Sequence, residues 1–81
     1  MKIENILSLV MDEVARAEEI HPYWPCDDIH AAAIVVEESG ELVKAVLDAT
    51  EKKAGEDEII AEAVQTAASA IRFLKNHITK S

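Results

Sequence analysis

Apolar residues recur at intervals of three and four positions along most of this chain, a spacing that predicts amphipathic helices. In the first segment, from about Lys2 to Ile20, they form one stripe, and acidic residues take the other faces. Two further segments, about Ile29 to Ala49 and about Asp57 to Asn76, have helical spacing as well. No stretch shows the strict alternation of apolar and polar residues that a half-buried strand needs. The pattern therefore predicts an all-α protein with three main helices.

Two breaks separate these segments. The first runs from His21 to Asp28 and contains two prolines, which stop a helix and push the preceding residue out of the helical region. Asp27 or Asp28 is the expected N-cap of the second helix. The other break lies near Thr50 to Gly55. Such a short chain with so few breakers predicts a single domain over residues 1–81.

The charge and composition exclude several classes of protein. Sixteen acidic residues against eight basic ones give a net charge of −8, which argues against a nucleic-acid polymer or an anionic membrane surface as partner. No run of about 18 apolar residues predicts a membrane span, and the first ten residues do not resemble a signal peptide. Cys26 is the single cysteine, so neither an internal disulfide nor a cysteine-based zinc site is expected. We expect a cytoplasmic protein.

The chain is small and rich in alanine, so its own core is expected to be marginal and association with further copies is expected. The second helix strengthens this expectation, because it has two apolar sides and only a thin polar stripe between them. The stripe consists of His30, Glu37, Glu41, Lys44 and Asp48. A helix of this kind is usually central in a bundle. We therefore expect a homodimer or homotetramer with a shared four-helix-bundle-type core.

Glu38 departs from this pattern because it projects among apolar positions of the second helix. Its neighbours on that side are Ala31, Ile34, Leu42 and Ala45. A buried carboxylate must be neutralised, paired or bound to a metal. Glu41 lies one turn away, and Glu62 of the third helix has alanine neighbours that allow close helix packing. These acids predict a site for a hard divalent cation, Mg²⁺ or alternatively Mn²⁺, and a solvated acidic edge is the other reading.

These residues also resemble a known family pattern. Glu37-Glu38-Ser39-Gly40-Glu41-Leu42, followed on the next helix by Glu62-Ala63-Val64-Gln65, is similar to the E-E-x-x-E and E-x-x-D motifs of the MazG-type all-α nucleoside triphosphate pyrophosphohydrolases. The run from His21 to Asp28 resembles the lead-in of short phage and bacterial members. The resemblance extends from about His21 to Leu74. Gln65 departs from the pattern, since it stands where the family has its last acid.

The resemblance implies a MazG-like bundle that cleaves the bond between the α- and β-phosphates, in a house-cleaning or pool-controlling role. It implies that Mg²⁺ is held by Glu38, Glu41, Glu62 and Gln65. It implies that Glu37 or Glu38 takes the proton of the attacking water. It implies substrate contacts at Trp24, Lys44 and His21.

Alternatives remain for several of these residues. Because Gln65 brings no charge, the chain could instead be a catalytically degenerate module that binds nucleotide or metal, and a plain helical dimerisation domain is a third reading. Trp24 could pin its loop onto the bundle, and Lys44 could pair with Glu41 or Asp48. Arg72 and Lys75 are expected to be solvated charges that complement the dipole of the third helix, rather than phosphate ligands.

Overall fold

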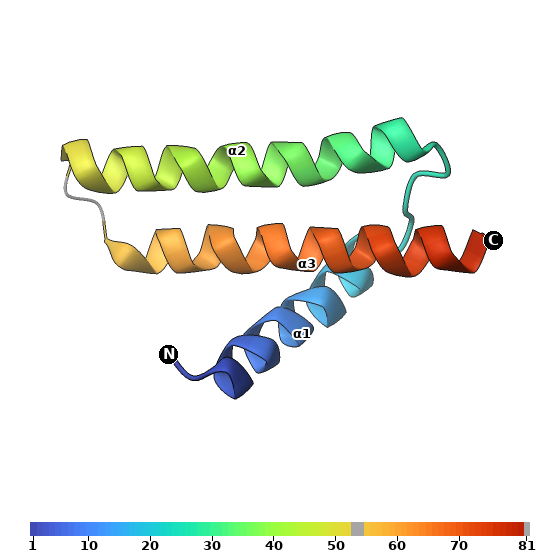
Figure 1. Ribbon diagram of the computed structural model, residues 1–81, viewed down its shortest axis with the longest axis horizontal. Coiled ribbons are helices and arrows are strands. Elements are labelled where there is room, and N and C mark those ends of the chain that lie inside the picture. The colour runs from blue at the N-terminus through green and yellow to red at the C-terminus, as the bar shows by residue number, and fades with distance from the viewer. Residues whose placement is uncertain (53–54, 81) are drawn as a thin grey trace.

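The computed structural model describes residues 1–52 and 55–80, and the side chains of all these except 52 and 78–80. Three helices occupy nearly all of this part of the chain: α1 (Ile3–Ile20), α2 (Asp28–Lys52) and α3 (Glu56–Lys80). Helices α2 and α3 run antiparallel and side by side, and α1 crosses α3 obliquely (Figure 1). The described residues include no strand, so the all-α prediction is confirmed for them.

The helix ends lie within a few residues of the predicted positions. Helix α1 ends where the His21 N–H donates to the Ala17 carbonyl, at 2.7 Å. Asp27 is the N-cap of α2, because its side chain accepts a hydrogen bond from the Ile29 N–H at 3.0 Å. Helix α2 continues to Lys52, beyond the predicted end at Ala49. Residues 53 and 54 of the second predicted break lie outside the described residues.

Helix α3, and not α2, is the central helix of the chain, because it packs against both of the others. On one side, Val10 and Val14 of α1 are buried against Ala68. On the other side, Ala31 and Ala45 of α2 are buried. Small residues on both sides of α3 let each neighbouring helix approach closely. The expected central position of α2 therefore does not hold within one chain.

The outer face of α2 stays open to solvent. Ile29 is 81% exposed and Val36 is 68% exposed, and further apolar side chains of α2 follow at helical spacing. These are Val43, Val46 and Leu47. Most of the apolar stripe of α1 is exposed as well, and no large side chain in the described part is fully buried. Despite this apolar surface, none of the described helices combines the length and hydropathy needed to span a membrane.

Candidate functional site

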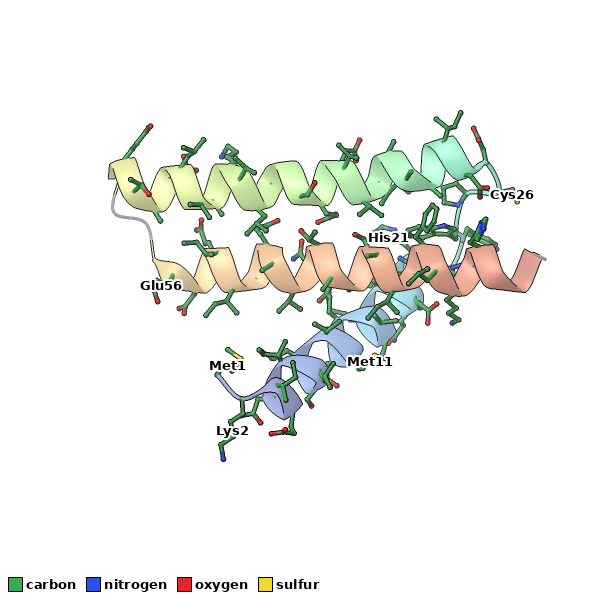
Figure 2. All side chains as sticks on the ribbon, viewed as in Figure 1. Met1, Lys2, Met11, His21, Cys26 and Glu56 are labelled. Carbon is green, nitrogen blue, oxygen red and sulfur yellow. The ribbon has the colours of Figure 1, made fainter. Side chains whose placement is uncertain are left out.

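Three carboxylates converge between α2 and α3. Glu38 and Glu41 lie one turn apart on α2, Glu62 comes from α3, and one ligand oxygen of each lies within 4.8 Å of the others. Side chains from both helices fill the space between the two ribbons (Figure 2). The nearby Ala45 is buried, and its small size brings the helices close enough for the acids to meet. We call Glu38, Glu41 and Glu62 the acidic trio.

Two members of the acidic trio carry buried oxygens without partners. Glu38 and Glu62 are half-buried, whereas Glu41 is exposed. The Oε2 atoms of Glu38 and Glu62 are shielded from solvent, and no described residue forms a hydrogen bond with either of them. Buried carboxylate oxygens in proteins normally have a partner, because an unmatched one is destabilising. The trio therefore lacks a positive group that would complete it.

The pKa values of Glu38 and Glu62 also indicate that the acidic trio lacks a positive group. Burial, followed by the charges of Glu41, Glu13 and Glu37, raises the pKa of Glu38. Burial, followed by the charge and hydrogen bond of Glu41, raises the pKa of Glu62. Without a cation, these carboxyls thus retain their protons to higher pH than ordinary glutamates do. An all-oxygen donor set with unmatched buried oxygens fits a hard divalent cation such as Mg²⁺.

A pocket of ≈ 450 Å³ borders the trio at Glu38 and is built from all three helices and the first break. Glu13, Arg16 and Ala17 line it from α1, and Ile34 and Glu38 from α2. The first break contributes His21, Tyr23, Trp24 and Pro25, and α3 contributes Gln65, Ala68, Ser69 and Arg72. The structure thus brings the predicted residues His21, Trp24 and Gln65 to the same pocket as Glu38. Figure 2 shows His21 at the end of α1, close to α3.

Two of the predicted site residues lie elsewhere. Lys44 lines a second pocket, of ≈ 340 Å³, that borders Glu41 and Glu62. Its Nζ pairs with Asp48 Oδ2 at 3.2 Å, so the helical ion pair considered from the sequence is formed. Glu37 is exposed and lies outside the acidic trio, although it precedes Glu38 directly.

The sequence interpretation missed Arg72. Instead of being solvated, Arg72 is only 7% exposed and lines the larger pocket. One of its terminal nitrogens donates to the His21 carbonyl at 2.6 Å, and its guanidinium carbon lies 5.0 Å from the centroid of the Trp24 ring. These contacts pin the first break onto α3, as considered for Trp24. The alanine-rich stretch before Arg72 was the available signal that it lies on a packed face.

The pair of Glu13 and Arg16 was missed as well. Arg16 forms a bidentate interaction with Glu13, at 2.9 and 2.7 Å, and both residues line the larger pocket. The hydrogen bond from Arg16 lowers the pKa of Glu13. Their three-residue spacing on one helix was a visible signal for the pair, but its place beside Glu38 depends on how α1 crosses α3.

Comparison with known proteins adds no assignment: no protein-family model matches this chain, and neither does any curated protein or solved structure.

Proposed function

We propose that this chain is a cytoplasmic nucleoside triphosphate pyrophosphohydrolase of the MazG type, dependent on Mg²⁺ or alternatively Mn²⁺, and active as a homodimer or homotetramer. The observation that carries the proposal is the acidic trio, with two buried oxygens that no described residue partners. Three of the four glutamates that carry the motif resemblance, Glu38, Glu41 and Glu62, are the ones that converge. The role of such an enzyme is house-cleaning or control of nucleotide pools.

The residues that would hold the metal are Glu38, Glu41 and Glu62, with the amide oxygen of Gln65 as a neutral addition. When bound, the metal supplies positive charge that attracts a triphosphate to an acidic protein and polarises its phosphoryl oxygens.

The carboxylates supply the proton transfer of the proposed hydrolysis. A water oxygen forms a bond to the α-phosphorus while the bond from that phosphorus to the bridging oxygen breaks, so that nucleoside monophosphate and pyrophosphate separate. The proton of the water passes to a carboxylate oxygen of Glu37 or Glu38.

The two pockets suggest how the nucleotide lies. The larger pocket has the Trp24 ring in its wall, and aromatic faces bind nucleobases by stacking. We place the base there, with His21 beside it, and the phosphates at the acidic trio. Lys44 lines the second pocket and contacts phosphate if it exchanges its ion pair with Asp48 for that contact.

The test is a product assay with each standard ribo- and deoxyribonucleoside triphosphate, in Mg²⁺ and in Mn²⁺. We expect pyrophosphate and nucleoside monophosphate, and a loss of roughly a hundredfold in activity for Glu38→Gln and Glu62→Gln, since each removes a charged metal ligand. Glu51→Gln is the matched control, because Glu51 is an exposed residue of α2 outside the trio. Absence of pyrophosphate under all conditions would refute the enzyme.

Gln65 favours a second candidate, a degenerate module that binds nucleotide without turnover. Its side chain is half-buried in the larger pocket beside Glu38, where the family pattern has an acid. Metal-dependent binding of nucleotide by calorimetry, without pyrophosphate release, would support this candidate. A chain that binds neither metal nor nucleotide would instead be a helical dimerisation domain.

A further inference from the structure

Arg16 of α1 is a solvent-exposed cation at the larger pocket. Two arginines line this pocket, and Arg72 is buried, whereas the side chain of Arg16 is 56% exposed. The Nε and one terminal nitrogen of Arg16 donate to the two carboxylate oxygens of Glu13. The other terminal nitrogen, Nη1, forms no hydrogen bond with a described residue. Since a guanidinium has more N–H groups than Glu13 uses, Arg16 can donate to a ligand while it keeps this contact.

Glu13 connects Arg16 to the part of the pocket that Glu38 borders. The Glu13 side chain is half-buried and lines the same pocket as Glu38. Burial and the charge of Glu41 contribute most to the raised pKa of Glu38, and the charge of Glu13 comes next, ahead of that of the adjacent Glu37. Electrostatic interactions weaken with distance, so the carboxylates of Glu13 and Glu38 lie near each other. Arg16, which contacts Glu13, is thereby held on the side of the pocket that borders the acidic trio.

The charges on this side of the pocket favour a phosphate group once a metal is bound. The metal would neutralise Glu38, and Arg16 already neutralises Glu13. A nucleotide whose phosphates bind the metal extends into a pocket that borders the acidic trio. In the larger pocket, a phosphoryl oxygen meets the exposed guanidinium of Arg16, whose planar set of donors matches the geometry of phosphate.

We propose that Arg16 is a phosphate-binding residue whose Nη1 donates to a phosphoryl oxygen of the metal-bound nucleotide, while Glu13 holds the guanidinium in position. This inference rests on the proposed function, because that function places the phosphates at the acidic trio. It makes α1 part of the site, although the motif resemblance begins only at His21. A donor that a neighbouring carboxylate already holds in place loses little conformational freedom when the ligand binds.

Removal of the Arg16 charge tests the proposal. Arg16→Gln should lower kcat/KM for nucleoside triphosphates roughly ten- to hundredfold, the range for one hydrogen bond between charged groups. Arg16→Lys should retain part of the activity, because lysine keeps the charge but lacks the planar set of donors.

Lys75→Gln is the matched control. Lys75 also pairs with a glutamate of α1, Glu18, at 2.7 Å, and it lies outside the residues that line the larger pocket. Exposed ion pairs contribute little to stability, so this variant should change kcat/KM by less than about twofold. An unchanged kcat/KM in Arg16→Gln, or equal losses in Arg16→Gln and Lys75→Gln, would overturn the proposal.

The affinity for metal alone separates a phosphate contact from an indirect effect on the acidic trio. Mn²⁺ is titrated without nucleotide into the native chain and into Arg16→Gln. We expect affinities within about threefold of each other, or tighter binding by the variant, because the Arg16 charge repels a cation. A loss of Mn²⁺ affinity as large as the loss in kcat/KM would show that Arg16 only supports the trio, and would refute the proposal. Circular dichroism checks folding, and Arg16→Lys replaces Arg16→Gln in this comparison if the latter does not fold.

The same variants distinguish a failure of this inference from a failure of the proposed function. Equal rates of pyrophosphate release by the native chain and Arg16→Gln would leave the pyrophosphohydrolase intact and remove the role of Arg16. If the native chain hydrolyses no nucleotide, calorimetry measures the binding of nucleoside triphosphate in Mg²⁺. Weaker binding by Arg16→Gln than by Lys75→Gln would then support the inference, and equal binding or no binding would overturn it.

Discussion

At the scale of single residues, the glutamates around the larger pocket fall into two electrostatic kinds. Glu13 has a direct cationic partner, and the hydrogen bond from Arg16 lowers its pKa. Glu38 and Glu62 have burial and other carboxylates around them, and their pKa values are raised. Burial is the largest cause of the raised pKa values of Glu38 and Glu62, whereas at Glu13 the hydrogen bond from Arg16 outweighs burial. Only Glu38 and Glu62 therefore call for an external cation.

This difference predicts how stability depends on pH in the metal-free protein. The pKa values of Glu38 and Glu62 are raised above the ordinary 4.5, so the folded state binds more protons than the unfolded state just above that value. The free energy of unfolding contributed by these two groups is then highest at acid pH and falls as pH rises above 4.5 and through their raised pKa values. Glu13 acts in the opposite sense and at lower pH, because its pKa is lowered.

Urea unfolding in a chelating buffer measures this dependence. The double variant Glu38→Gln, Glu62→Gln should lose the acid-side stabilisation relative to the native chain, whereas Glu51→Gln should keep it. The histidines are present in both the native chain and the double variant. The difference between their pH profiles of unfolding free energy therefore reports Glu38 and Glu62 alone. Mg²⁺ should stabilise the native chain more as pH rises above the raised pKa values, because metal binding needs ionised carboxylates. Identical pH profiles for the native chain and the double variant would contradict the prediction.

Gln65 allows a test of where the metal lies. Gln65→Asp adds a carboxylate beside Glu38, and we expect Mn²⁺ to bind roughly tenfold more tightly, because an added negative charge near a divalent ion is strongly favourable even in a partly hydrated site. Gln65→Asn is the control, since it has the size of aspartate without its charge. Calorimetric titration gives both affinities. Equal affinities in the two variants would show that Gln65 does not border the metal.

How far single residues could be predicted depends on the range of the interactions involved. Glu38 could be recognised from the sequence, because its apolar neighbours lie on its own helix. The meeting of Glu38 with Glu62 followed once a packed interface between their two helices was assumed. Arg72 and Glu13 could not be placed, because the pocket that they share forms only when α1 and the first break close over α3.

At the scale of elements, α2 has one face packed on α3 and one open face, and Gly40 lies on the open one. A Cβ added at Gly40 would meet no atom within 4 Å. Gly40→Ala should therefore raise the free energy of unfolding by about 0.5–1 kcal/mol, since alanine loses less conformational freedom in a helix. Ala33→Gly, another exposed position of α2, should lower it by a similar amount. Denaturant unfolding measures both, and destabilisation by Gly40→Ala would mean that another surface packs there.

The existence and type of the elements were predictable, but their arrangement was not. Periodicity and the two prolines predict three helices. Helix α2 extends beyond the predicted end at Ala49 and includes Thr50 and Glu51. The pattern of α2, with two apolar sides, predicted a central helix. Periodicity reports which sides of a helix are apolar, not which helix covers them. Helix α3 is central because its alanines are small enough for both α1 and α2 to pack closely against it.

At the scale of the molecule, the chain exposes more apolar surface than its small core explains. Among the residues whose side chains the structure describes, the buried hydrophobic ones are Val10, Val14, Ala31, Ala45 and Ala68. The open face of α2 carries the exposed apolar residues Ile29, Val36, Val43 and Leu47 at helical spacing, and Val36 borders Phe73 and Leu74 of α3 at the edge of this face. Contiguous exposed apolar patches on small proteins usually mark an interface. A second copy presenting the same stripe would cover this face and supply the shared core that the chain lacks.

Sedimentation velocity tests this last prediction. We expect a species of at least two chains at micromolar concentration. Val36→Asp should weaken association at least about tenfold, because a carboxylate within a dry interface loses its hydration. His30→Asp adds the same charge on the polar edge of α2 and should leave association nearly unchanged. A monomeric native chain, or equal association of the two variants, would show that the stripe is not the interface.

Since the acidic trio lies on the opposite side of α2 from this stripe, such a dimer would leave metal binding by each chain intact. Loss of association and loss of metal binding would therefore be separable in the same set of variants.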